Sequence, residues 1–572
     1  MRSREPGNCA TGLDGIDLHP ILRRIYTSRG VQSADELVTT LDRLLPPNSL
    51  GGLDAAVDLL EQAIRQQQRI AIVGDFDADG ATSSALMMEA LGLLGARHVQ
   101  YFVPNRFEYG YGLTPEIVHL TAEWQPDLLV TVDNGISSIE GVITAKKYGF
   151  SVLITDHHLP GKELPAADAI VNPNLPDNTF ASKNLAGVGV AFYVMLGLRK
   201  RLRETGWFAE ASIAEPNLAT LLDLVALGTV ADVVPLDQNN RILVQQGLAR
   251  IRAGCCRPGI KALIQLSGRT LQRLVATDMG FCIGPRLNAA GRLDDMSIGI
   301  ECLLTQNPET AMTLAAELDQ LNRSRREIEA SMQDQALQNL DQITTDKAQL
   351  PIGLCLYDPG WHQGVIGILA SRIKEKFYRP VIIFADGDES EIKGSARSIP
   401  GVHIRDVLDV IATENPMLLS RFGGHAMAAG LTISKDKLTD FQQAFDTEVT
   451  RVLNGRPLAN ELLSDGHLQN DEFTLNLAET LRAAGPWGQY FPEPLFDGVF
   501  VVQHSRIVGS THLKLLLMPE NGSIVLNAIA FNQAEFFPLQ AGTRLKAAYR
   551  LDSNEYRGTI NLQLLIHYME LE

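Results

Sequence analysis

Apolar and polar positions alternate along the first half of the chain in a rhythm of short buried strands and amphipathic helices. An amphipathic helix beginning at Leu53 leads into an apolar run at residues 70–73. A helical pattern at 83–95, a strand pattern at 99–103, a helical pattern near 115–124 and strand patterns at 128–132 and 152–155 follow. This alternation predicts an α/β fold built on a parallel sheet.

The pattern changes twice further along the chain. A long helical stretch at about 311–340 is followed by a second α/β segment, with strands at 352–356 and 381–384 and a helix at 367–377. From about residue 456 the sequence shows short runs of alternating apolar and polar residues, which predict strands at 499–502, 512–517, 524–529, 544–549 and 560–564. Five such strands predict a small β-barrel of the OB-fold type, a common nucleic-acid binder. A barrel used only for packing or partner contact is the alternative.

The length of the chain implies several domains, because 572 residues exceed one ordinary core. We predict an N-terminal arm at 1–50, a parallel-sheet domain at 51–300 and a connecting helix at 301–348. A second α/β domain at 349–455 and the OB-fold-like domain at 456–572 complete the chain.

Composition limits the classes of function. The formal net charge of −17 argues against a protein that coats nucleic acid indiscriminately, but it allows a locally basic groove. The six cysteines show neither CxxC pairs nor zinc spacing, so we expect them to be reduced. No run of about 18 uncharged apolar residues and no signal-peptide core occur, which predicts a cytoplasmic protein without membrane contact.

The strongest candidate for chemistry follows the strand at 70–73. Asp75, Asp77 and Asp79 alternate there and are followed by Gly80. Carboxylates this close repel one another, so such a group predicts a hard divalent cation bound by oxygen ligands. A calcium-binding EF-hand loop would need a glutamate where Leu86 stands and a helix before the loop. A solvated acidic turn is the other alternative.

Two further predicted strands end in metal-ligand residue types. Residues 133–135 (Asp-Asn-Gly) follow the strand at 128–132, and residues 156–158 (Asp-His-His) follow the strand at 152–155. Parallel strands bring their carboxyl ends to one edge of the sheet, so we expect these side chains to meet. The apolar segment 221–230 leads to Asp232, which we expect at a neighbouring strand end.

These motifs, in this order, resemble those of the DHH phosphoesterase superfamily. Residues 284–292 (GPRLNAAGR), 393–398 (KGSARS) and 421–430 (RFGGHAMAAG) are similar to motifs of its RecJ branch. The resemblance covers about residues 50–450, with a compatible C-terminal remainder. It identifies 51–300 as a DHH catalytic domain and 349–455 as a DHHA1 domain.

The resemblance implies hydrolysis of phosphodiesters with two ions of Mn²⁺ or Mg²⁺. The implied metal ligands are Asp75, Asp77, Asp79, Asp133, His157 and Asp232, and the implied catalytic residues are Asp77, Asp133, His157 and His158. We assign Asp75 and Asp77 chiefly to one ion, and Asp79, His157 and Asp232 to the other. Asp133 bridges the two, and Asp156 orients an imidazole. Many members carry a histidine where this chain has Val73, so Asp75 has the least defined role.

The resemblance also supplies candidates for binding the substrate. These are Arg106, Arg286, Asn288, Arg292, Ser395, Arg397 and His425. A guanidinium group matches phosphate oxygens with two hydrogen bonds, and the Ser395–Arg397 element resembles a pocket for a terminal 5′-phosphate. Surface salt bridges and tight turns are the structural alternative at each position.

The implied activity is a 5′-to-3′ exonuclease that hydrolyses single-stranded DNA to mononucleotides in DNA repair and recombination. A single-stranded-DNA-binding protein and a helicase are the candidate protein partners. The residues alone indicate only a metal-dependent phosphoesterase with a third domain. One alternative is a DHH-family phosphodiesterase that acts on short RNA or cyclic dinucleotides. Another is a non-enzymatic replication scaffold, which predicts missing ligands.

Overall fold

The computed structural model describes residues 1–4, 12–13, 15–105, 112–343, 350–387, 390–556 and 558–572. The chain forms two compact units. The first comprises residues 1–291, 295–318 and 462–572, and the second comprises 292–294 and 319–461. The predicted fold class is confirmed, because the described residues contain a parallel sheet, a second α/β sheet and a closed barrel. The five domain boundaries given above stay predictions.

The parallel sheet of the first unit has the strand order β3-β2-β4-β5-β6. Its strands are β2 (Ile70–Gly74), β3 (Val99–Phe102), β4 (Leu128–Val132), β5 (Ser151–Thr155) and β6 (Ala169–Val171). All neighbouring pairs are parallel. The central strands β2 and β4 are buried along their whole length, as expected for a sheet covered on both faces.

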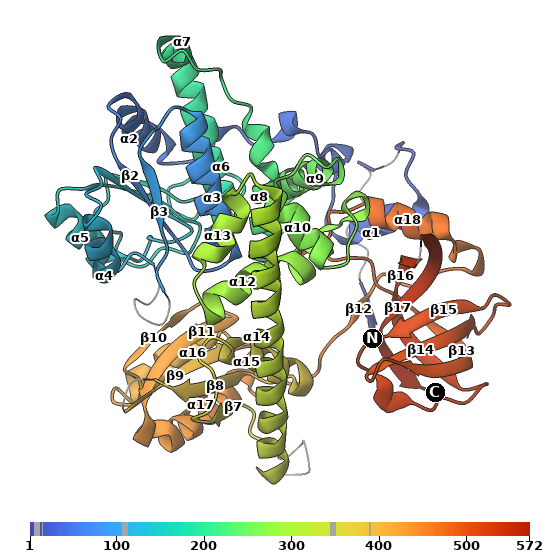
Figure 1. The fold of residues 1–572 in the computed structure, drawn as a ribbon. Helices are drawn as coiled ribbons and strands as arrows, with labels where there is room; N and C mark the ends of the chain where they lie inside the picture. The colour runs from blue at the N-terminus through green and yellow to red at the C-terminus, as the bar shows by residue number, and fades with distance from the viewer. Residues whose placement is uncertain (5–11, 14, 106–111, 344–349, 388–389, 557) are drawn as a thin grey trace. The chain divides into compact units, whose positions relative to one another are not determined.

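Helices cover both faces of this sheet (Figure 1). The helices α4 (Pro115–Ala122) and α5 (Ile139–Lys147) pack on one face, where their apolar residues form a cluster with those of β2, β4 and β5. The helices α2 (Leu53–Arg65), α3 (Ala78–Leu93) and α6 (Gly187–Glu204) pack together on the other face. The carboxyl ends of β2, β4 and β5 therefore meet at one edge, beside the start of α3.

A group of helices extends the first unit beyond the sheet. It includes α8 (Leu222–Ala231), α9 (Gln238–Arg252), α10 (Pro258–Leu266), α12 (Gly284–Leu293) and α13 (Ser297–Leu304). The expectation that Asp232 follows a strand is wrong, because the apolar segment before it forms α8. A continuous apolar run does not distinguish a buried strand from a helix buried on all sides. Here the run packs as a helix against α3, α6 and α9.

The predicted long helix is present as α14 (Pro308–Ile343), which is 36 residues long. It carries the chain from the first unit into the second, because the boundary between them falls after Leu318. Ala311 and Ala315 are buried near its start. Met332 and Ala336 belong to an apolar cluster of the second unit.

The second unit has a mixed sheet with the order β10-β11-β9-β8-β7. The strands are β7 (Leu354–Tyr357), β8 (Val381–Asp386), β9 (Glu391–Arg397), β10 (Arg421–Gly424) and β11 (Ala428–Ser434). Helix α15 (Ile366–Phe377) contributes to the apolar cluster on one face. Helices α16 (Ile404–Glu414) and α17 (Leu438–Leu453) contribute to the cluster on the other.

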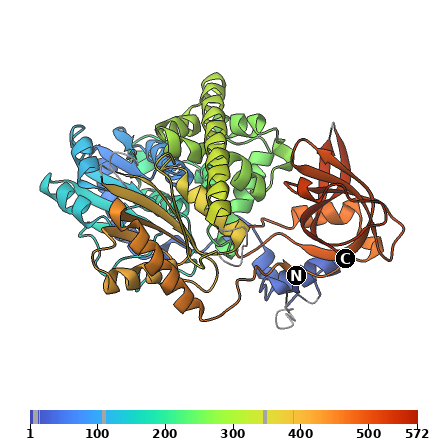
Figure 2. The ribbon, with the colours of Figure 1, turned by 90° about the horizontal axis from the view of Figure 1, so that it is seen from below.

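The predicted five-stranded barrel closes in the order β13-β14-β15-β17-β16 (red in Figures 1 and 2). Its strands are β13 (Phe496–Val508), β14 (His512–Pro519), β15 (Leu526–Ala530), β16 (Arg544–Tyr556) and β17 (Thr559–Leu571). Helix α18 (Leu475–Ala483) packs against β16. Among the described residues, no helix has the length and apolar character needed to cross a membrane.

Candidate metal centre and phosphate-binding residues

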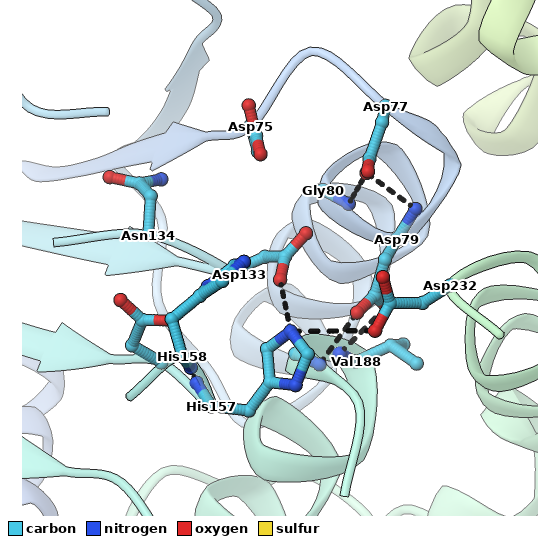
Figure 3. Close-up of polar contacts among 12 residues, drawn as sticks. Asp75, Asp77, Asp79, Gly80, Asp133, Asn134, His157, His158, Val188 and Asp232 are labelled. Atoms are coloured by element: carbon cyan, nitrogen blue, oxygen red, sulfur yellow. Dashed lines mark hydrogen bonds and ion pairs between the residues drawn. The ribbon is translucent and has the colours of Figure 1, made fainter. Parts of the chain in front are cut away.

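The loop between β2 and α3 places the first three aspartates. Asp77 is the N-cap of α3, and its Oδ1 accepts hydrogen bonds from the backbone N–H groups of Asp79 (2.9 Å) and Gly80 (3.0 Å). The cap starts the helix at Ala78, five residues before the start that the sequence pattern predicts. Asp79 consequently lies in the first turn of the helix rather than in the loop (Figure 3).

Asp79 is buried and held by the start of another helix. Its Oδ2 accepts a hydrogen bond from the backbone N–H of Gly187 (2.6 Å), and its Oδ1 accepts one from Val188 (3.0 Å). These residues open α6, whose positive N-terminal end favours a carboxylate. A Cβ at position 187 would lie 2.6 Å from Asp133 Oδ1, so only glycine fits there. The strand-end motifs do not point to Gly187 and Val188; their only signal in the sequence is small residues before an apolar helical run.

Asp133, His157 and Asp232 meet at the same edge of the sheet (Figure 3). His157 Nε2 lies 3.1 Å from Asp133 Oδ1 and 3.5 Å from Asp232 Oδ2. Asp133 Oδ1 and His157 Nε2 are both buried, and neither makes a hydrogen bond within the described part of the chain. Two potential ligand atoms that face each other without a hydrogen bond fit a shared cation. Asp232 reaches this place from the end of α8 and not from a strand.

The potential ligand atoms form three groups, in each of which the atoms lie within 4.8 Å of one another. The groups are Asp79, His157 and Asp232; Asp75, Asp77 and Asp133; and Asp133, His157 and His158. The first two groups share no residue, so the edge offers two neighbouring places for a cation. Val73 is buried in β2, and its side chain belongs to the apolar cluster.

In the absence of a cation, burial and mutual repulsion disfavour the ionised forms of these carboxyl groups. Burial and the charge of Asp232 raise the pKa of Asp79 to about 7. Burial and the charge of Asp77 raise the pKa of Asp232 to about 8, and burial raises the pKa of Asp133 well above its usual value. Divalent cations among them would reverse this by favouring the ionised forms. The donor set therefore fits Mn²⁺ or Mg²⁺.

The surroundings shift the pKa values of the two histidines in opposite directions. Burial lowers the pKa of His157, which favours the neutral imidazole that binds metals. Burial also disfavours a charged His158, but the hydrogen bond and charge of Asp156 outweigh it and raise the pKa of His158 to about 9. Asp156 Oδ1 lies 2.7 Å from His158 Nδ1 and accepts hydrogen bonds from the backbone N–H groups of both histidines. Asp156 thus orients the ring of His158 and favours its charged form beside the ligand groups.

Helix α12 forms a hydrogen bond with the end of the loop that carries Asp75 and Asp77. The side-chain Oδ1 of Asn288 accepts a hydrogen bond from the backbone N–H of Ala78 (2.7 Å), at the first residue of α3. Arg286 is buried and donates to the backbone carbonyl of Cys282. Both side chains thus make contacts within the fold. Arg106 lies outside the described residues.

Ser395 and Arg397 lie together on β9 in the second unit. Arg397 Nη1 donates to Ser395 Oγ (3.1 Å) and to the carbonyl of Ala396 (2.8 Å). A Cβ at Gly367, in the first turn of α15, would lie 2.9 Å from Arg397 Nη2 and 3.0 Å from Ser395 Oγ. A guanidinium, a hydroxyl and the start of a helix therefore converge, as in many phosphate sites.

The remaining two candidates also belong to the second unit. Arg292 Nη1 donates to the carbonyl of Gly364 (3.2 Å). His425 is exposed in the turn between β10 and β11, where its backbone N–H donates to the carbonyl of Ala428 (2.8 Å).

The sequence matches three protein families. It matches the DHH family, N-terminal domain, at residues 69–229, the DHHA1 domain at 351–451 and the RecJ OB domain at 464–568. The single-stranded-DNA-specific exonuclease RecJ of Dickeya dadantii is 56% identical, over 96% of this chain and 96% of the relative. The RecJ exonuclease of Escherichia coli is 55% identical over the same shares of both chains.

Solved structures agree with this similarity. RecJ from Thermus thermophilus in complex with Mn²⁺ is 31% identical, with a TM-score of 0.78 over 97% of this chain and 76% of that one. The complex of the same enzyme with Mg²⁺ is 30% identical, with a TM-score of 0.73 over 97% and 75% of the two chains. The chain therefore belongs to the RecJ family of DHH phosphoesterases.

Proposed function

We propose that this chain is a metal-dependent exonuclease that hydrolyses single-stranded DNA to mononucleotides from the 5′ end, in DNA repair and recombination. One observation carries the proposal. Two adjacent groups of carboxylate and imidazole ligands lie at one sheet edge, in a chain 56% identical over almost its full length to a single-stranded-DNA-specific exonuclease.

The ligand groups support specific roles. Asp75 and Asp77 would hold one ion, and Asp79, His157 and Asp232 the other, with Asp133 between them. Bound Mn²⁺ or Mg²⁺ would supply an activated water, a polarised phosphoryl group and neutralisation of the leaving oxygen. The helix N-terminus at Gly187 and Val188 fixes Asp79 in place, so the chain itself prepares the geometry.

His158 would act on the phosphate rather than as a ligand. The hydrogen bond and charge of Asp156 raise the pKa of His158, which favours the charged imidazole, and Asp156 orients the ring through Nδ1, so that Nε2 would face the substrate. A positive donor at this place would bind a non-bridging phosphate oxygen and stabilise its charge as the bond to the leaving oxygen breaks.

The cluster of Ser395, Arg397 and the start of α15 would bind the terminal 5′-phosphate. The guanidinium group of Arg397 and the N-terminal end of α15 both favour a dianionic terminal phosphate over an internal monoanionic one. Such a pocket would make the enzyme begin at the 5′ end. Arg106, Arg286, Arg292 and His425 stay candidates for further phosphate contacts, whereas the bond of Asn288 to Ala78 supports a positioning role.

The proposed partners follow from the same activity. Single-stranded DNA is the substrate, and the OB-type barrel supplies a second domain suited to it. A helicase that unwinds duplex DNA and a single-stranded-DNA-binding protein would supply and protect that substrate. We place this activity in the cytoplasm.

A substrate comparison with Mn²⁺ present tests the proposal. Single-stranded DNA, duplex DNA and short RNA, each labelled at the 5′ end, and cyclic dinucleotides are incubated with the wild-type chain. We expect labelled mononucleotide from single-stranded DNA first, with duplex DNA degraded far more slowly. Asp133→Ala removes the shared carboxylate and should abolish the product, while Asp54→Ala, an exposed aspartate on α2, should leave it unchanged.

The alternatives give different results. Faster hydrolysis of short RNA or cyclic dinucleotides would favour the other phosphodiesterases of the superfamily. Binding of single-stranded DNA without any product, in the wild type as in Asp133→Ala, would favour a scaffold.

A further inference from the structure

The residue after the ligand Asp232 has an unusual conformation. Val233 has a φ of +61°, in the left-handed region that β-branched residues rarely adopt. Val233 is 62% exposed, although it is apolar and stands two residues after the end of the largely buried helix α8. Strained residues of this kind cluster at functional sites, where the surrounding structure enforces them.

An exposed aromatic ring lies on the segment packed against this end of α8. The segment η6 (Met279–Ile283) is a π-helical turn, a form often found at functional sites. Met279 and Ile283 are buried, whereas Phe281 between them is 74% exposed. The turn thus presents one large apolar ring to water while its neighbours join the core.

Close contacts fix this segment beside Asp232. A Cβ at Gly280 would lie 3.4 Å from Val230 Cγ1, and a Cβ at Gly284 would lie 3.2 Å from Ala231 Cβ. Val230 and Ala231 immediately precede Asp232. The turn that carries Phe281 is therefore packed against the last turn of α8, which leads to Asp232 and Val233.

Single exposed apolar residues are common on protein surfaces and need no explanation by themselves. Here one of them follows a ligand of the metal centre on a strained backbone, and the other stands on a π-helical turn packed against the helix that ends at that ligand. The substrate class proposed above offers what such side chains bind, because the bases of single-stranded DNA have free faces that stack on aromatic rings.

We propose that Phe281 and Val233 form an apolar edge beside the metal centre, on which a base of the single-stranded substrate near the cleaved bond stacks. This inference rests on the proposed nuclease activity. It adds a determinant of specificity, because the bases of duplex DNA are already stacked on one another and cannot use the edge.

The test combines variants of Phe281 with substrates that lack one base. Oligonucleotides carry a single abasic site at successive positions from the 5′ end, and kcat and KM are measured for the wild type and for Phe281→Ala. We expect the wild type to lose about tenfold or more in kcat/KM when one particular position near the cleaved bond is abasic. Phe281→Ala should show a similar loss with intact DNA and little further loss at that position.

Further variants separate stacking from folding. Phe281→Tyr and Phe281→Trp should retain activity, because both keep the ring, and Phe281→Leu should fall between them and Phe281→Ala. Leu93→Ala provides the control, since Leu93 is an exposed apolar residue at the far end of α3. Thermal unfolding and Mn²⁺ binding should be unchanged in all of them.

The outcomes are distinct. Losses from Phe281→Ala and from an abasic site that multiply independently at every position would overturn the stacking edge while leaving the nuclease intact. A wild-type chain that leaves intact single-stranded DNA unhydrolysed would instead overturn the proposed function.

Discussion

We expect the carboxylate of Asp133 to be needed for binding the metal ions but to destabilise the metal-free fold. It lies in both the Asp75 group and the His158 group of ligands, and burial with four neighbouring carboxylates raises its pKa. Asp133→Asn should lower kcat by more than about a hundredfold, since even the outer partners of metal ligands are worth 10- to 100-fold. The same change removes a repelled carboxylate, so the metal-free variant should unfold at a temperature about 2 °C or more above the wild type. Equal melting temperatures of the two metal-free proteins would contradict this account.

The raised pKa values of Asp79 and Asp232 predict how metal affinity depends on pH. In the metal-free fold these carboxyls hold protons up to about pH 7 and 8, whereas the unfolded chain releases them near pH 4. Stability of the metal-free protein should therefore fall as pH rises from about 5 to 8. Protons compete with the cation, so Mn²⁺ affinity should rise over the same range. Calorimetric titration between pH 6 and 8.5 should show tighter binding with fewer protons released as pH increases. A constant affinity would argue against these shifts.

Among single residues, the sequence predicts the metal ligands better than the groups that hold the ligands in place. Asp77, Asp133 and His157 follow strands whose apolar patterns are unambiguous, so their meeting at one edge follows from parallel pairing. The supports of Asp79 are backbone N–H groups of Gly187 and Val188, more than a hundred residues away. Every residue except proline has such a group, and only the packing of α6 selects these two.

Among the elements, α8 shows where apolar pattern alone fails. Its ten residues are apolar on nearly every side, because α3, α6 and α9 surround it. The same residues would suit a buried strand. The pattern therefore predicts the location of Asp232 at the edge of the sheet correctly, but it predicts a strand where the structure has a helix. Its length favours a helix, but ten residues decide weakly, and the turn residues Pro216 and Asn217 before it and Pro235 after it suit either element.

Helix α6 depends on glycine at its first residue. Gly187→Ala should improve the intrinsic helix propensity and still damage the site, because the added Cβ would lie 2.5 Å from Asp133 Cβ. We expect Mn²⁺ affinity and kcat to fall by about tenfold or more. Gly92→Ala in α3, where no atom lies within 4 Å of the added Cβ, is the matched control and should leave both quantities unchanged.

The contact of Asn288, on helix α12, with the start of α3 should affect kcat and not the binding of DNA. Asn288→Ala leaves the Ala78 N–H without its partner, which costs about 1 kcal/mol or more and loosens the start of α3. Steady-state kinetics should show kcat reduced about fivefold or more, with KM for DNA nearly unchanged and weaker Mn²⁺ binding. A higher KM with unchanged kcat would show instead that Asn288 contacts the substrate.

For the whole molecule, the order of patterns along the chain predicts each fold but not the contacts between distant segments. The pattern predicts an N-terminal arm before α2 but not its contacts. Helix α1 (Pro20–Ser28) and the residue after it contact the segment that leads into the barrel. Arg29 Nη2 donates to Asp465 Oδ2 (2.8 Å), and its Nε donates to the carbonyl of Pro492 (3.1 Å). The side chains of Arg29 and Asp465 are 1% and 0% exposed. Both lie in the first unit, although 436 residues separate them.

Breaking this pair should loosen the first unit without touching the chemistry. Arg29→Met leaves the buried carboxylate of Asp465 with only the longer ion pair to Arg4 (3.5 Å), which costs about 3 kcal/mol, the lower end for a broken buried pair. Lys200→Met, which removes the exposed pair with Glu204, should cost about 0.5 kcal/mol or less. Arg29→Met should therefore be cleaved by protease near residues 462–466 at a concentration that spares the wild type and Lys200→Met. Asp465→Asn in the Arg29→Met background removes the poorly compensated charge, so the double variant should regain part of the lost resistance. Cleavage of the double variant as fast as that of Arg29→Met would show that the arginine contributes through packing and its bond to Pro492 instead.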